Sequence, residues 1–182
     1  MTRRSFLIGT AALAGCQFLP EDDDFWVEVS LGTSTFRCSK DYYSVGDVRT
    51  PLGLQDALRV ASSFGAKLPT KEQVDAIWKA ADLKLAPIPL TPGPKMTSQS
   101  YWEKHDALID KQITTRMSDL NMYDYKLVAG HKKDVLIPQS PNDSFVTIYG
   151  WHRLNGKPIQ PIYRGHSASY YDYSHGIRFI QT

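Results

Sequence analysis

The chain has 182 residues, of which 42% are hydrophobic and 22% are charged. These fractions are close to the average of globular proteins, so they exclude a disordered chain and favour one folded domain. The formal net charge is only +2, and the lysines and arginines are spread along the sequence, which argues against a nucleic-acid partner.

The N-terminal segment is typical of a bacterial export signal. Arg3 and Arg4 precede an apolar run from Phe6 to Ala14, which is shorter than the roughly 20 residues that cross a bilayer. The stretch "TRRSFL" resembles the twin-arginine export motif, and "LAGC" resembles a lipobox, in which the cysteine becomes lipidated. These resemblances imply a protein that is exported, by the twin-arginine or the general secretory route, and anchored to a membrane through Cys16.

The expected organisation has three parts: a signal peptide with lipobox over residues 1–16, an acidic tether over 17–24, and a single globular domain over 25–182. The tether "QFLPEDDD" has few apolar residues to bury. With Cys16 lipidated, Cys38 is the one thiol left in the mature domain, and one thiol cannot form an internal disulfide. We therefore expect Cys38 to be a buried structural residue.

The globular part begins with a predicted hairpin and two predicted helices. The runs "FWVEVSL" and "STFRCS" show the period-2 pattern of strands, and Gly32-Thr33 between them predicts a turn. The first helix is "LQDALRVASSF", which Gly65 should end. The second helix begins at Thr70, which forms a capping-box pattern with Gln73.

The middle of the chain combines a proline-rich segment with a third helix. The segment "APIPLTPGPK" at residues 86–95 has four prolines, which exclude an α-helix and indicate an extended stretch that crosses the surface or lines a groove. The following "SQSYWEKHDALIDKQI" at residues 98–113 carries Tyr101, His105 and Leu108 on one side of a helix. This pattern favours a partly buried core position for His105.

The last third contains short strand-like runs separated by Pro, Gly and Asn. The runs are "YKLVAG", "DVLIP", "FVTIYG", "KPIQPIY", "ASYYDY" and "GIRFI". Asn155-Gly156 is a strong signal for a hairpin turn. We therefore predict one α+β domain with an N-terminal hairpin, about three helices and a C-terminal antiparallel sheet.

Four of the five histidines lie between residues 131 and 175, and each is within two residues of a glycine. They are His131, His152, His166 and His175. Strand ends and turns are places where side chains converge at the mouth of a sheet. We therefore expect these histidines to converge on one cleft, with Tyr171 or Tyr173 beside them.

An extended conformation of residues 168–177 would separate the side chains of this stretch into two faces. Tyr171, Tyr173 and His175 would share one face. Ser174 would lie on the other face, so Ser174 and His175 should not form a nucleophile–base pair. The "G-x-S-x-G" motif of serine hydrolases does not occur either.

His175 is the first candidate for a catalytic base. Its neighbour Gly176 has no side chain, which would leave room for a ligand to approach the backbone. An imidazole can act as a base at neutral pH, with a tyrosine as the acid. The candidate catalytic residues are His152, Tyr171, Tyr173 and His175.

A zinc site is the alternative to metal-free chemistry. His131, Asp134 and His166 are candidate ligands, because imidazole and carboxylate bind zinc and a catalytic zinc needs three protein ligands. The set resembles that of small zinc cell-wall peptidases, which are α+β domains with histidine and aspartate ligands on antiparallel strands. This chain departs from that family at "HKKD", where the two ligand types are three residues apart, and it lacks both His-x-His and "H-E-x-x-H". The candidate cofactor is zinc, and the alternative is no metal.

The aromatic residues of the same region also suit a sugar ring, which stacks on aromatic faces. The candidates are Trp151, Tyr163, Tyr170, Tyr171 and Tyr173. The alternative is that these rings form cross-strand pairs, which would stabilise the sheet and bind nothing.

Together these observations favour an exported, lipid-anchored hydrolase, periplasmic or on the cell surface, that acts on a cell-envelope or extracellular polymer such as peptidoglycan or polysaccharide. The alternative is a non-catalytic lipoprotein that binds glycan or a protein partner. An enzyme needs polar groups that converge in a concave site, whereas a binding module needs only an exposed aromatic platform. The C-terminal pattern that ends in "YDYSHGIR" resembles a domain that recurs in secreted bacterial proteins, which agrees with export.

Overall fold

The computed structural model of the protein describes residues 25–181. The predicted signal peptide, the lipidation of Cys16 and the tether lie outside the described residues. The predicted α+β class is confirmed, because three α-helices and several small sheets make up the described part of the chain. Over residues 25–181, no helix is both long and apolar enough to span a membrane.

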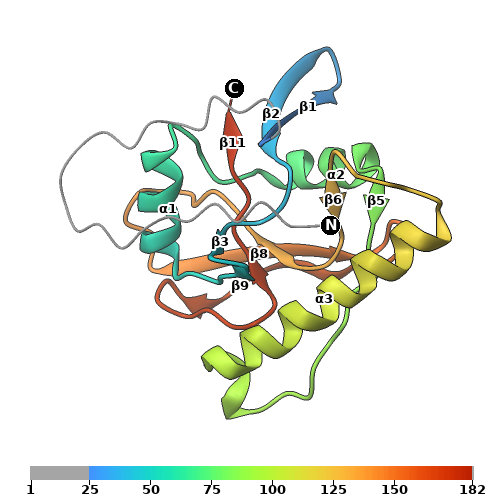
Figure 1. Ribbon diagram of the computed structural model, residues 1–182. Helices are drawn as coiled ribbons and strands as arrows, with labels where there is room; N and C mark the ends of the chain where they lie inside the picture. Colours follow the sequence, from blue (N-terminus) through green and yellow to red (C-terminus); the bar gives the residue numbers. More distant parts are fainter. Residues whose placement is uncertain (1–24, 182) are drawn as a thin grey trace.

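The predicted N-terminal hairpin is present, and a C-terminal strand extends it. Strands β1 (Trp26–Leu31) and β2 (Ser34–Ser39) pair antiparallel around Gly32, whose φ of 62° suits a residue without a side chain. The last strand, β11 (Ile180–Gln181), pairs with β2 and gives the order β1-β2-β11. Figure 1 shows the hairpin projecting at the top of the molecule, close to β11.

The first two helices lie close to their predicted bounds. Helix α1 (Leu54–Ser63) ends just before Gly65, which has a φ of 58°. Helix α2 (Lys71–Ala80) begins with the predicted capping box. The Gln73 N–H donates to the Thr70 hydroxyl over 3.3 Å, and the Thr70 N–H donates to the Gln73 side chain over 2.9 Å.

Helix α3 (Gln99–Asp119) is longer than predicted, since the prediction ended at Ile113. The helix continues because Met117, one turn beyond Ile113, still packs against a buried apolar cluster. It ends where Asn121 adopts a φ of 51°, the left-handed conformation that commonly follows a helix. His105 is completely buried on the inner face of α3, more deeply than predicted.

The proline-rich segment forms no α-helix but contains a short 3-10 helix, η1 (Pro94–Thr97). Its backbone is held to Tyr173 from the far end of the chain. The Leu90 N–H donates to the Tyr173 hydroxyl over 2.8 Å, and the Tyr173 N–H donates to the Met96 carbonyl over 3.0 Å. The segment therefore crosses over Tyr173.

The C-terminal sheet has four strands in the order β10-β7-β8-β9. They are β7 (Lys133–Val135), β8 (Phe145–His152), β9 (Pro158–Ser167) and β10 (His175–Gly176). As predicted, β7, β8 and β9 are antiparallel, and Asn155-Gly156 lies in the turn between β8 and β9. The predicted antiparallel sheet also contains β10, which runs parallel to β7.

Four shorter strands join other parts of the chain in pairs. They are β3 (Ser44–Val45) with β4 (Val48–Arg49), which are antiparallel, and β5 (Leu83–Lys84) with β6 (Val128–Ala129), which are parallel. The second pair connects the chain after α2 to the chain after α3.

The predicted strand "ASYYDY" is wrong, because residues 168–174 form turns. The Asp172 carboxylate accepts a hydrogen bond from the Ser174 N–H over 2.8 Å, which bends the backbone as in an Asx turn. The alternation of faces expected for an extended segment therefore does not apply here.

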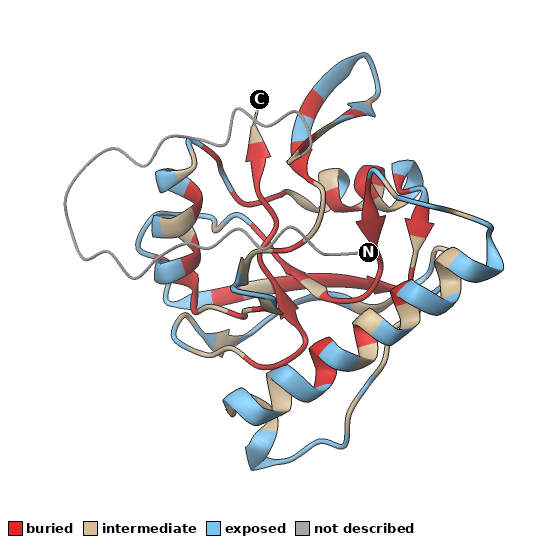
Figure 2. Cartoon of the chain, viewed as in Figure 1, coloured by how far each residue is buried: buried red, intermediate tan, exposed pale blue. Residues whose placement is uncertain are grey.

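The core consists of apolar side chains from the sheets and from all three helices. Figure 2 shows the buried residues along the central strands and on the inner faces of the helices. Cys38 is completely buried, as predicted, and burial raises the pKa of its thiol to about 11. A thiol with so high a pKa is a poor nucleophile, so a structural role fits it.

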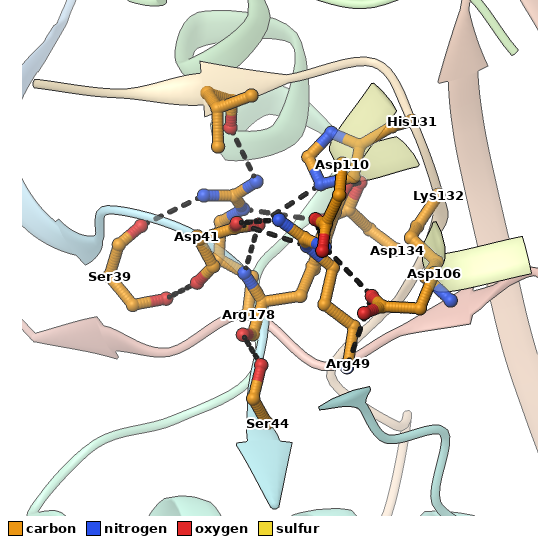
Figure 3. Close-up of polar contacts among 12 residues, drawn as sticks. Ser39, Asp41, Ser44, Arg49, Asp106, Asp110, His131, Lys132, Asp134 and Arg178 are labelled. Carbon is orange, nitrogen blue, oxygen red and sulfur yellow. Dashed lines mark hydrogen bonds and ion pairs between the residues drawn. The ribbon is translucent and has the colours of Figure 1, made fainter. Parts of the chain in front are cut away.

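A network of buried charged residues connects the elements around this core (Figure 3). Arg49 lies at its centre with only 2% of its side chain exposed. Its guanidinium donates to Asp41 and Asp106 over 2.7 Å each and to Asp110 over 2.9 Å. Burial alone would lower the pKa of Arg49, but Asp41 and Asp106 more than offset it and raise that pKa well above its usual value. Arg49 therefore holds β4 against α3.

Arg178 is the second buried arginine of this region (Figure 3). Its guanidinium donates to the backbone carbonyls of Ser39 over 2.8 Å and of Val128 over 2.9 Å. The same group lies over the Tyr42 ring, 4.2 Å from the ring centroid. Arg178 thus joins the end of β2 and strand β6 to the segment that leads into β11.

Removal of the Arg49 charge should destabilise the protein strongly. Arg49→Met would leave Asp41 and Asp106 in a buried site without their counter-charge, which costs about 3–5 kcal/mol. The measurement is the free energy of unfolding from chemical denaturation followed by circular dichroism.

The matched control for this prediction is Arg59→Met. Arg59 pairs with Asp56 at the surface, and 73% of its side chain is exposed, so its loss should change stability by about 0.5 kcal/mol or less. If the two variants were equally stable, the central role of Arg49 would be refuted.

Candidate functional site

His131 belongs to the buried ionic network. Its Nε2 lies 3.0 Å from Asp41 Oδ1, and the ring is completely buried. Burial lowers the pKa of His131 to about 4, although Asp41 favours the charged form, so the ring is neutral at pH 7. The Trp151 indole N–H fixes the local backbone by donating to the His131 carbonyl over 3.1 Å.

Asp134 lies three residues along the chain but has partners of its own. The Tyr42 hydroxyl donates to Asp134 Oδ2 over 2.9 Å, and Arg178 Nε lies 3.8 Å from Oδ1. Burial raises the pKa of Asp134 to about 6. Tyr42 therefore holds one oxygen of this carboxyl group by a hydrogen bond, and Arg178 lies close to the other oxygen.

The predicted metal ligands do not form one ligand group. His131 faces Asp41 and Asp134 faces Tyr42, whereas His166 lies outside this network, stacked on Tyr170. Within residues 25–181, no three or more His, Cys, Asp or Glu side chains come together in a way that could hold a metal ion.

His152 occupies a second environment, between β8 and α2. Its Nε2 lies 3.1 Å from Asp75 Oδ1, and the Tyr149 hydroxyl donates to the same oxygen over 2.8 Å. Lys71 donates to the other oxygen of Asp75 over 2.7 Å, and the Trp78 ring stacks on His152 at 5.7 Å between centroids. These contacts hold the end of β8 against α2.

The stretch from Gly165 to Gly176 contains a third environment, which is built around Asp172. Asp172 Oδ1 accepts from the Ser174 hydroxyl over 2.6 Å, and Oδ2 accepts from the Tyr170 hydroxyl over 3.0 Å. Burial opposes ionisation of this carboxyl, but the neighbouring His175 and the hydrogen bonds from Ser174 lower the pKa of Asp172.

The Ser174 hydroxyl is thus bound to Asp172 rather than to His175, in line with the expectation that Ser174 and His175 form no nucleophile–base pair. The expected cause, an alternation of the two side chains along an extended strand, is wrong. The two side chains are separated by a turn centred on Asp172 and not by the two faces of a strand.

His175 is buried next to this turn. Its Nε2 lies 4.0 Å from Asp172 Oδ2, and neither ring nitrogen has a hydrogen-bond partner among the described residues. Burial lowers the pKa of His175 to about 4, so the ring is neutral at pH 7. His105 in α3 is likewise a buried imidazole without a hydrogen-bond partner on either nitrogen among the described residues.

The predicted room for a ligand at Gly176 is taken by the protein itself. A Cβ atom at position 176 would lie 2.6 Å from the Tyr42 ring and 2.8 Å from the Lys132 Cβ. The glycine is therefore needed because β10 packs closely against Tyr42 and β7, and no ligand reaches the backbone there.

Four rings extend from His175 toward the surface, and we call Tyr163, His166, Tyr170 and His175 the ring cluster. His166 stacks on Tyr170 with centroids 4.0 Å apart and planes 23° apart. Tyr163 meets His166 edge to face at 5.0 Å, and His175 lies 6.4 Å from His166 and 5.8 Å from Tyr170. His175 is buried, His166 and Tyr170 are half-buried, and Tyr163 is 42% exposed, so exposure increases from His175 to Tyr163.

Tyr171 and Tyr173 lie apart from this cluster. Tyr171 packs against Trp102 of α3 at 5.6 Å. Tyr173 is buried under the proline-rich segment, with its ring 4.8 Å from His105 and 6.4 Å from Trp151. Of the five aromatic residues proposed for sugar stacking, Tyr173 and Trp151 are therefore closed off from the surface.

The strained backbone of Trp151 explains its burial. Its φ of 54° is unusual for a bulky residue and follows Gly150, whose φ is 102°. The strand pairing shifts register between Ile148 and Gly150, which is the mark of a β-bulge. The extra residue lies on β9, between Gln160 and Tyr163. The Trp151 ring is buried, and Lys133 Nζ lies 5.1 Å from its centroid.

The predicted cleft of four histidines is thus divided among three environments. His166 and His175 lie together in the ring cluster. His131 and His152 bind to two different aspartates, Asp41 and Asp75.

Sequence reasoning missed the buried residues of the ionic network. The completely buried Lys132 donates to the Tyr173 carbonyl over 2.7 Å, and burial together with the nearby Arg49 lowers its pKa to about 7. The sequence contained one signal for the aspartates of this network. Asp106 and Asp110 are four residues apart in α3 and have the same helical spacing as Ile109 and Ile113, which indicates that they lie on its inner face.

The described surface carries two shallow grooves, and neither is lined by the ring cluster. One lies between β1 and α2, and Asp75 is at its edge. The other lies between β2 and β11, close to Lys67.

Comparisons with protein-family models, with curated proteins and with solved structures found no match to this chain.

The buried imidazoles predict that the protein loses stability in acid. His131 and His175 have pKa values near 4 in the folded protein and 6.5 as the ordinary value, so the unfolded chain binds their protons more tightly. The stability that these two neutral imidazoles contribute is therefore fully present above pH 6.5, and it is lost as the pH falls through 4. Asp134 acts in the opposite direction between about pH 6 and 3.8. It is one group against three, because burial also lowers the pKa of His105, to about 2.

We therefore expect the melting temperature to fall steadily from pH 7 to pH 4, measured by circular dichroism at constant ionic strength. A melting temperature that is constant or rises over this range would show that these histidines are not buried in the neutral form.

Proposed function

We propose that the protein is an exported, lipid-anchored binding protein that attaches to a glycan polymer of the cell envelope or the extracellular space. Its recognition surface is the outer part of the ring cluster, formed by Tyr163, His166 and Tyr170. The export signal and Cys16 support the location.

The observation that carries this proposal is the gradual exposure of the ring cluster. Tyr163 is 42% exposed on strand β9, which lies at the edge of its sheet, and His166 and Tyr170 are half-buried behind it. Aromatic faces of this kind suit the apolar faces of sugar rings. The residues proposed for catalysis do not come together: His152 is bound to Asp75, Tyr173 is buried and bound to Leu90, and His175 is buried in the ring cluster. This separation favours binding over catalysis.

A second candidate function is hydrolysis of the same polymer, and one observation favours it. The neutral imidazole of His175 has two unused nitrogens and lies 4.0 Å from the Asp172 carboxylate. A histidine beside a carboxylate can act as a general base. Substrate or water would have to reach it past His166 and Tyr170.

Binding should depend on the Tyr163 ring. The purified protein is mixed with insoluble peptidoglycan, chitin beads and alginate beads, and the bound fraction is measured. Tyr163→Ala should weaken retention on the polymer that binds by about five- to thirtyfold, as expected when a central aromatic contact is lost.

The matched control for Tyr163→Ala is Tyr123→Ala. Tyr123 is 86% exposed and lies in the loop between α3 and β6, far along the chain from the ring cluster, so its loss should leave retention unchanged. Equal retention of both variants would refute the proposed surface.

Turnover of the same three polymers separates the two candidate functions. As a binding protein, the wild type should release no soluble sugar or peptide fragments. If fragments are released, His175→Gln should lower the rate by about 10²–10⁴-fold while the protein still binds the polymer. Such a result would replace the first candidate by the second.

A further inference from the structure

Gly165 follows Tyr163 by two residues on β9, in a stretch where the pairing with β8 shifts register between Tyr163 and His166. Such a β-bulge interrupts the regular alternation of side chains along the strand. The Tyr163 ring lies in the space that a side chain at 165 would need. A Cβ atom at position 165 would be 2.9 Å from Tyr163 Cε2 and closer still to Cζ and the hydroxyl. The ring is therefore folded along the strand, over the Gly165 backbone.

The backbone of Gly165 does not itself require a glycine. Its φ is outside the left-handed region, unlike that of Gly150 or Gly156 in the same sheet, so any residue could adopt it. The three atoms nearest to an added Cβ all belong to the Tyr163 ring, so this ring is what a side chain at position 165 would meet first.

A tyrosine that lies on a glycine keeps one face against the protein and turns the other outward. Side chains in strands ordinarily stand perpendicular to the sheet, and a perpendicular Tyr163 would present its edge. In the observed pose, Tyr163 meets His166 at an interplanar angle of 70° and is still 42% exposed. Its outer face can accept a flat partner.

We propose that Gly165 is a positioning residue that sets the pose of Tyr163, and that the outward face of Tyr163 is the stacking surface for one sugar ring of the polymer. This inference rests on the proposed function and deepens it. Recognition then occurs through the apolar face of a pyranose ring and not through charged substituents. Retention should accordingly change little between low and high salt, since stacking is not screened by ions.

The test is Gly165→Ala in the full-length protein, with peptidoglycan, chitin and alginate as the probes. The added methyl group displaces the far end of a flexible side chain and meets no backbone, so the melting temperature should change by about 3 °C or less. Retention on the bound polymer should nevertheless fall by about five- to thirtyfold, as for Tyr163→Ala. The double variant should bind no more weakly than either single variant, because both act through one ring.

The matched control is Gly93→Ala. Gly93 is exposed, has no atom within 4 Å of an added Cβ and also lacks a left-handed φ, so the substitution should leave retention unchanged. A readout independent of any polymer is the NMR shift of the His166 ring protons, which the Tyr163 ring current should alter in Gly165→Ala but not in Gly93→Ala.

The outcomes separate this inference from the proposed function. If Tyr163→Ala weakens retention and Gly165→Ala does not, the positioning role is refuted and the glycan surface stands. If the wild type binds none of the polymers, the proposed function fails, and unchanged His166 shifts in Gly165→Ala would refute the positioning role as well.

Discussion

The arrangement of the domain depends on the contact of the Arg49 guanidinium with three aspartates. Asp41 follows the N-terminal hairpin, whereas Asp106 and Asp110 come from α3, more than 50 residues further along the chain. A buried charge that loses its partner costs several kcal/mol, so these segments cannot shift independently. Arg178 adds the C-terminal segment to the same assembly through the carbonyls of Ser39 and Val128. The short strands of this protein are thus held in place by charge pairing as well as by apolar packing.

The buried ionic network also limits which residues can contact a ligand. It takes up His131 and Asp134, two residues that the sequence suggested for metal binding, and it surrounds Lys132. Burial keeps His131 neutral at pH 7, and its Nε2 is bound to Asp41. Residues that form the interior are poorly placed to contact a polymer, which is why the proposed recognition surface lies at the edge of the sheet.

The interior nevertheless supports that edge through a continuous series of contacts. The Asp172 turn binds the Tyr170 hydroxyl, Tyr170 stacks on His166, and His166 meets Tyr163. Each ring is therefore held by the one behind it, which lowers the entropy that a ligand must remove on binding. Gly165 completes the arrangement by letting the outermost ring lie flat.

The sequence by itself determined the local structure. Period-2 and helical patterns, the Thr70 capping box and the glycine turns predicted the hairpin, the helices and most strands, because these signals involve residues within a few positions of one another. Tertiary structure decided the long-range pairings. The alternating letters of "ASYYDY" looked like a strand, but the Asp172 side chain competes for the backbone and forms a turn. The four histidines share a sequence context but lie in different places. His131 and His152 are bound to aspartates from distant segments, Asp41 and Asp75, whereas His166 and His175 have neighbours within four residues along the chain. No local pattern encodes such a pairing, since charge complementarity is satisfied only once the chain has folded.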